Sequence, residues 1–255
     1  MSAELPMSAE PEDPDEIGSD AADVADVADV ADAVDDIEDE EPRASDGRVP
    51  GRRGRATRQR LLDCTLRMLE HNSYRDLKVV DIAREAGTSP ATFYQYFPDV
   101  EEAILALAEE MASAGNERLT AIVRTGKWRG AAGYATAQAI SDSYITFWDD
   151  NWPLMRVIDL TSEEGDQRFR SIRTRLLNEF TVALSEVISA EKKAGRHPDE
   201  VDPMATAGVL VSMLAHVASH RYGFEFYGIR TDELRRSMAR IVFTTVSGQK
   251  PPKMG

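Results

Sequence analysis

From Thr57 onward, apolar residues recur at helical spacing, and the alternation typical of half-buried strands is scarce. The first helix is predicted over 57–72, where Asn72 can end it in a left-handed conformation. A second, short helix covers 79–86 and stops at Gly87. A third runs over 90–97, before a proline. The pattern therefore predicts an all-α protein that opens with short helices.

Longer helices are predicted to fill the rest of the chain. One starts near Asp99, a second contains 134–148, and "FWDDNWPLM" leads into a further helix. The next has its apolar stripe over 169–188 and stops at Gly195. The last two span Pro203–Tyr222 and Thr231–Val246, with Thr231 as an N-cap.

Charge divides the chain into unequal parts. Of the 45 acidic and 30 basic residues, 18 acids and 2 arginines lie within 1–50. Residues 1–50, here called the leader, therefore carry a net charge of −16, and the remaining residues carry a net charge of about +1. Its repeats, such as "ADVADVADVADAVDD", have a three-residue period that gives no coherent apolar face. This composition predicts a disordered acidic leader, which either competes with DNA for the following basic stretch or only improves solubility.

Composition also indicates the cellular compartment. One cysteine, Cys64, excludes an internal disulfide and fits a reducing cytoplasm. Its helical spacing with Leu61 and Met68 favours a small core residue over a reactive thiol. No apolar run is long enough to span a membrane, and no secretory signal is visible. A cytoplasmic protein without a membrane partner is therefore expected.

The stretch "REAGTSPATFYQYFPD" has the layout of a helix-turn-helix motif. Gly87 permits the positive φ that ends the first helix, Ser89 can cap the second, and Pro90 occupies a position without an intrahelical N–H bond. In this motif the second helix enters the major groove of DNA. Its outer face carries hydroxyls and one amide, whereas Phe93 and Phe97 are placed to face inward.

Together with "TRQRLLDCTLRMLEHNSY" before it, "VVDIAREAGTSPATFYQYFPD" resembles the DNA-binding domain of the tetracycline-repressor (TetR) family. The resemblance covers about residues 55–111. It implies a homodimer that binds a palindromic double-stranded DNA operator and is released by a small ligand. The predicted DNA-contacting residues are Arg55, Arg58, Lys78, Thr88, Ser89, Pro90, Ala91, Thr92, Tyr94, Gln95 and Tyr96.

Three positions depart from the family pattern. Lys78 stands where a capping Ser or Thr is usual, and Ser73 replaces a glycine. Asp99 and Val100 follow the Phe-Pro pair, where the family often has a phosphate-binding lysine. The arginines before the motif are expected to supply phosphate contacts instead; they are Arg52, Arg53, Arg55 and Arg58.

The predicted organisation is a leader over 1–50, a DNA-binding domain over 51–100, a ligand-binding and dimerisation domain over 101–247, and a flexible tail over 248–255. The resemblance implies that the last two helices form the dimer contact. Small residues on the first of them permit close helix approach; they are Ala205, Gly208, Ser212, Ala215 and Ser219.

Aromatic residues concentrate between Trp128 and Trp152. An apolar cavity with a few polar tips would suit a small apolar effector, although the same rings can simply fill a core. The residues predicted to line it are Tyr134, Tyr144, Phe147, Trp148, Trp152, Met155 and Phe180. Met155 and Phe180 are expected to come from the next two helices.

No arrangement typical of catalysis is present, so neither an enzyme nor a cofactor is predicted. His216 and His220 lie one helical turn apart, but no third ligand accompanies them, which favours packing over a metal site. The sequence thus predicts a ligand-responsive repressor. A constitutive or activating DNA-binding regulator with a filled core is the alternative.

Overall fold

The computed structural model describes residues 51–252, which form helices and connecting turns, with no strand among them. The all-α prediction is confirmed for this part of the chain. The leader predicted over 1–50 and the end of the tail predicted over 248–255 lie outside the described residues. The described residues belong to one compact unit, Arg43–Gly255. Between residues 51 and 252, no helix has the length and apolar character needed to cross a membrane.

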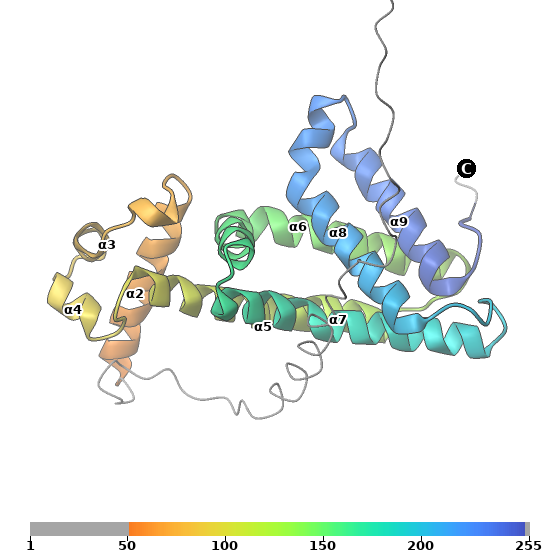
Figure 1. Cartoon of the computed structure of the whole chain (residues 1–255), viewed down its shortest axis with the longest axis horizontal. Helices are drawn as coiled ribbons and strands as arrows, with labels where there is room; N and C mark the ends of the chain where they lie inside the picture. Colours follow the sequence, from red (N-terminus) through yellow and green to blue (C-terminus); the bar gives the residue numbers. More distant parts are fainter. Residues whose placement is uncertain (1–50, 253–255) are drawn as a thin grey trace, which may run out of the picture. The chain divides into compact units, whose positions relative to one another are not determined.

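Four elements, three of them short, open the described part of the chain and lie beside one another (Figure 1). They are α2 (Arg52–Leu69), the 3-10 turn η1 (Tyr74–Asp76), α3 (Val79–Glu85) and α4 (Pro90–Tyr94). Long helices follow. They are α5 (Val100–Thr125), α6 (Gly130–Glu163), α7 (Gln167–Lys193), α8 (Pro203–Phe226) and α9 (Thr231–Ser247).

The long helices pack side by side, with α5 and α7 running parallel and α6 and α9 running antiparallel. α5 packs chiefly on α7, and α6 packs chiefly on α9. α8 covers α7 and also contacts α9 (Figure 1). α2 reaches the body through α5 and α6. Their apolar stripes merge into one buried core that runs from α2 to α9, so the short helices rest on the same core as the long ones.

The ends of α2 differ from the prediction. The helix begins at Arg52, before the predicted start at Thr57, because the arginine-rich segment is free of proline and arginine is a good helix former. Asn72 does not take a left-handed conformation, since every described residue with positive φ is a glycine. Its side-chain amide instead donates to the Met68 carbonyl at 2.8 Å, which satisfies that end of the helix directly.

α6 continues through Pro153, so the prediction of a new helix after "FWDDNWPLM" is wrong. Buried Leu154, Met155 and Ile158 continue the apolar pattern beyond the proline and hold both halves in one element. Pro153 has no N–H to donate, and such a residue bends a helix. Figure 1 shows that α6 changes direction along its length.

The last two helices start and stop close to their predicted limits. α8 extends to Phe226, one turn past the predicted end at Tyr222. Thr231 is the first helical residue of α9 and not its cap. Arg230 takes the cap position, and its backbone N–H donates to the Glu233 carboxylate at 3.2 Å.

Candidate functional site

The turn between α3 and α4 has the predicted geometry. Gly87 adopts φ +65°, which an L-residue adopts only with strain. The Thr88 N–H donates back to the Ala83 carbonyl at 2.8 Å, which closes the end of α3. At the start of α4, the Ser89 hydroxyl accepts from the Thr92 N–H at 3.2 Å, and Pro90 follows as the first helical residue. The turn therefore sets the angle between two short helices.

The exposed side of this motif is small and polar. Ser89, Pro90, Ala91 and Gln95 are exposed, and so is Tyr94, at 53%. Phe93 and Phe97 face inward as predicted, and their ring centroids lie 5.6 Å apart. Thr88 and Thr92 are half-buried, and the Thr92 hydroxyl lies 3.0 Å from that of Ser89. This surface offers hydrogen-bonding groups without bulky charged side chains.

The end of α4 corrects one part of the prediction. The helix stops at Tyr94, with Gln95 as its C-cap, and does not extend to Phe97. Gln95 and Tyr96 consequently lie in the turn before α5. Tyr96 is half-buried and packs against the core, so its ring does not face outward as expected. Five helical residues give no further turn on which to present it, and α5 lies close behind.

Arg58 has a different contact from the one predicted. Its guanidinium donates to the Glu110 carboxylate of α5 at 3.1 Å and lies 5.4 Å from the Phe97 ring centroid. Only 14% of its side chain is exposed. Arg58 therefore ties α2 to the body. Arg52, Arg53 and Arg55 are exposed on the first turns of α2, and exposed Lys78 stands before α3 without capping it.

Most of the aromatic residues predicted for the ligand pocket are buried together. Tyr144 stacks on Trp148 with 6.4 Å between ring centroids, and its ring lies 5.9 Å from that of Phe180. Phe147 and Met155 are also buried, and Met155 belongs to α6 and not to a separate helix. Tyr134 is buried near the start of α6, edge-on to Phe243. These six residues therefore lie in the body core.

Trp152 does not join them. It is 41% exposed, and the Arg156 guanidinium lies 5.0 Å from its ring centroid. Its contact with exposed Arg156, one turn further along α6, leaves part of the ring in solvent. The structure does not support Trp152 as a lining residue of a buried pocket.

Two family comparisons decide the identity of the fold and motif. Residues 61–107, which include α3, the turn and α4, match the family described as bacterial regulatory proteins, tetR family. Residues 119–253 match the tetracyclin repressor-like C-terminal domain. The chain belongs to the TetR family. It is therefore a DNA-binding transcriptional regulator, and α3–turn–α4 is its helix-turn-helix.

A curated relative agrees with this assignment. An uncharacterized HTH-type transcriptional regulator of Haemophilus influenzae is 29% identical over 134 residues, which are 52% of this chain and 63% of the relative. The chain thus spans somewhat less than two thirds of that relative's length.

Solved structures share the fold at low sequence identity. A TetR-family regulator from Mesorhizobium loti has a TM-score of 0.61 at 18% identity, covering 77% of this chain and 98% of its own. The fatty acid degradation regulator FadR of Bacillus halodurans has a TM-score of 0.58 at 15% identity, covering 77% of this chain and 97% of its own. FadR of Bacillus subtilis in complex with stearoyl-CoA has a TM-score of 0.55 at 16% identity, covering 75% of this chain and 98% of its own.

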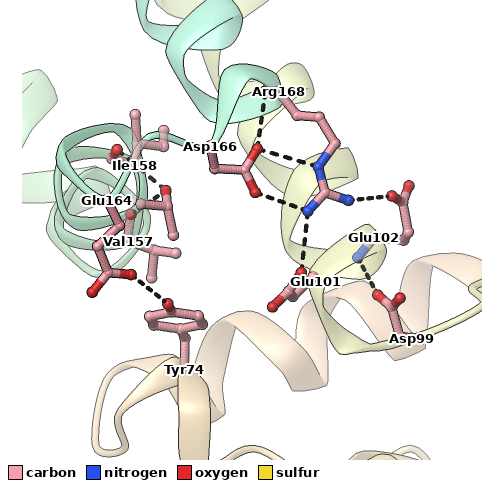
Figure 2. Close-up of polar contacts among 10 residues, drawn as sticks. Tyr74, Asp99, Glu101, Glu102, Val157, Ile158, Glu164, Asp166 and Arg168 are labelled. Carbon is pink, nitrogen blue, oxygen red and sulfur yellow. Dashed lines mark hydrogen bonds and ion pairs between the residues drawn. The ribbon is translucent and has the colours of Figure 1, made fainter.

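In this TetR-family chain, ion pairs connect η1 to the end of α6, and the start of α7 to the start of α5. The Arg75 guanidinium and the Tyr74 hydroxyl, both on η1, donate to the Glu164 carboxylate at the end of α6. At the start of α7, Arg168 donates to Glu102 at 2.8 Å and to Glu101 at 3.1 Å, both in the first turn of α5 (Figure 2). The α6–α7 turn therefore contacts both η1 and α5.

Charge pairing shifts the protonation equilibria in this junction. The hydrogen bond from Arg75 holds the pKa of Glu164 below its usual value. The hydrogen bond from Arg168 does the same for the pKa of Asp166, which also accepts the Arg168 backbone N–H at 2.9 Å. Both carboxylates thus remain ionised at neutral pH. The sequence did not predict this junction, because its partners lie far apart in the chain.

Proposed function

We propose that this regulator is a repressor, that it binds a palindromic operator as a homodimer, and that a small lipophilic effector releases it. The observation that carries the proposal is the exposed polar face of α4 and its following turn on a TetR-family body. Tyr94 and Gln95 face solvent at the end of the recognition helix, where a side chain can reach base edges.

The outer surfaces of α8 and α9 support the dimer. Val209 is 72% exposed and Met204 is 50% exposed on α8, and Ile241 is 44% exposed on α9. A groove of about 330 Å³ runs between them, lined by Ala205, Thr206, Val209, Leu210, Met213, Ile241 and Thr245. A second copy of the chain is the occupant that a TetR-family regulator would place there. An exposed apolar groove of this kind is otherwise costly in water.

One residue that was predicted for the dimer interface lies in the core of the protein instead. Ala215 is buried against the core, so it faces away from the groove. Ala205, Gly208 and Ser212 remain on the outer side, and a Cβ added at Gly208 would meet nothing within 4 Å. These three small residues leave room for a partner helix.

The effector is supported by the body core and by one structural neighbour. The buried rings of α6 and α7 give an apolar lining, and the similar FadR of Bacillus subtilis binds stearoyl-CoA. The α6–α7 turn contacts η1 and α5, so a shift of α6 on binding would move the DNA-binding helices. A differential affinity of about 1.4 kcal/mol between the two states suffices for a tenfold loss of operator affinity.

The arginines at the start of α2 are expected to set the salt dependence of binding. Replacing Arg52 and Arg53 with alanine should lower the slope of log K against log salt by up to about 0.9 for each phosphate that is no longer neutralised. Arg58→Ala should leave that slope unchanged and lower the free energy of unfolding, because Arg58 pairs with Glu110. Operator titrations between low and moderate salt, with urea unfolding of each variant, check both. A lower salt slope with an unchanged free energy of unfolding for Arg58→Ala would contradict the pairing of Arg58 with Glu110 as its main role.

The experiment that tests the proposed function is displacement from the operator. The complex with a selected palindromic duplex should dissociate when stearoyl-CoA or a shorter lipophilic probe is added, as followed by fluorescence anisotropy of the labelled duplex. Operator binding that persists through a broad lipophilic panel would favour the constitutive or activating regulator. The close stacking of Tyr144 on Trp148 is the observation that favours this second candidate, because such rings fill space.

A further inference from the structure

His216 and His220 form a pair on the outer side of α8. Their rings stack, with 4.1 Å between the ring centroids and 20° between the ring planes. The sequence favours packing for these residues, yet both are exposed, so neither ring is covered within one chain. Two histidines four positions apart on one helix face can bind the same metal ion. The pair therefore presents two nitrogen ligands on one side of α8.

Hydrogen bonds determine which nitrogen of His220 is available. Its Nδ1 lies 3.1 Å from the His216 carbonyl oxygen, which can only accept, so Nδ1 carries the proton. The Ser219 hydroxyl lies 2.7 Å from the same nitrogen and donates to the same carbonyl at 3.1 Å. Nε2 of His220 consequently keeps its lone pair. A hydrogen bond from the other ring nitrogen to a backbone carbonyl is the usual support of a histidine that binds a metal.

One chain does not complete a metal site around this pair. Within residues 51–252, no group of three or more histidine, cysteine, aspartate or glutamate side chains is arranged to hold a metal ion. A structural zinc ion takes four ligands in a tetrahedron, so two nitrogens leave half of its coordination open. The missing ligands have to come from another molecule.

The place of the pair on α8 indicates which molecule this is. Val209 and Met213 line the groove assigned to the dimer, and His216 and His220 continue their line at spacings of three and four residues. All four residues therefore lie along one face of the helix. α8 spans Pro203–Phe226, so His216 lies close to the middle of the helix. In a two-fold contact, residues near the point where a helix crosses its own copy meet their counterparts.

We propose that two chains share one zinc ion at the dimer contact, bound by His216 and His220 of both copies. This inference rests on the homodimer of the proposed function and adds a metal to its interface. Four imidazoles without a carboxylate favour zinc and similar transition metals over magnesium or calcium. Both side chains are exposed, so small rotations are enough to direct the two Nε2 atoms of one chain at one ion. The shared ion stabilises the dimer.

Zinc titration of the metal-free full chain tests the site. Calorimetry should give one zinc ion for two chains, and light scattering should show that zinc lowers the dissociation constant of the dimer. His220→Gln removes two of the four ligands from each dimer. It should weaken zinc binding by more than the about 100-fold that the loss of an outer-shell partner costs.

His71→Gln is the matched control, because it removes another exposed histidine, beyond the end of α2, and should bind zinc like the unmodified chain. Val209→Asp keeps both histidines and is designed to separate the copies, so it should bind zinc at least about tenfold more weakly.

Four results would each overturn the inference. They are one zinc ion bound per chain, no zinc binding by the unmodified chain, an equal loss of binding in His71→Gln and His220→Gln, and unchanged zinc affinity in a Val209→Asp chain that light scattering shows to be a monomer.

Operator binding separates this inference from the proposed function. If zinc binds at the expected ratio but no lipophilic probe releases the duplex, the metal site stands and release by effector fails. If stearoyl-CoA releases the duplex while the chain does not bind zinc, the repressor mechanism stands and the metal site is wrong.

Discussion

Replacing Tyr94 and Gln95 together with alanine is expected to lower operator affinity by about 100-fold or more. The Gln95 amide can pair with two atoms of an adenine edge, and one such contact discriminates by about 1–3 kcal/mol. Tyr94 is 53% exposed at the end of α4, where its hydroxyl can reach a phosphate or a base. Fluorescence anisotropy with a selected operator measures the loss.

This substitution should leave the fold intact, because neither side chain is buried. Circular dichroism and the melting temperature should therefore match those of the unmodified chain. Asn178→Ala removes an exposed amide from α7 and serves as the control that keeps operator affinity. A double variant that binds within about threefold of the unmodified chain would show that α4 does not read the operator.

Val209→Asp is expected to convert the dimer into a monomer and to weaken operator binding by about 100-fold or more. Val209 is 72% exposed, and it lines the groove between α8 and α9. In a symmetric contact each substitution enters twice, so two carboxylates would be desolvated in one apolar surface. A monomer binds one half-site and loses an avidity of about 10²–10⁴ that comes from linking two sites.

Light scattering after gel filtration measures the mass, and anisotropy measures operator affinity. Leu160→Asp places the same charge at another exposed apolar position, on α6, and should leave the dimer intact. A Val209→Asp chain that remains a dimer would place the contact on another surface.

The sequence predicts those features that depend on residues close together in the chain. The helix-turn-helix follows from Gly87, Ser89 and Pro90, each of which acts on its own few residues of backbone. The inward Phe93 and Phe97 follow from their spacing. The apolar stripes of the long helices are predictable as well, because residues at helical spacing within one helix form its buried face.

Features that depend on packing between distant residues escaped prediction. No residue close to Arg58 in the sequence indicates that its guanidinium will contact Glu110 and Phe97. The half-burial of Tyr96 depends on where α5 lies, and the continuity of α6 through Pro153 depends on core contacts on both sides. Arg168 likewise meets Glu101 and Glu102 only after the helices have packed.

The measurement that most directly tests the central claim, that α4 docks in the major groove as one of a symmetric pair, is selection of duplexes from a random-sequence pool. The full chain should enrich a two-fold symmetric sequence whose half-sites lie about 34–36 Å apart, with two chains bound to each duplex. Enrichment of an asymmetric site by a single chain, or no enrichment at all, would contradict the account.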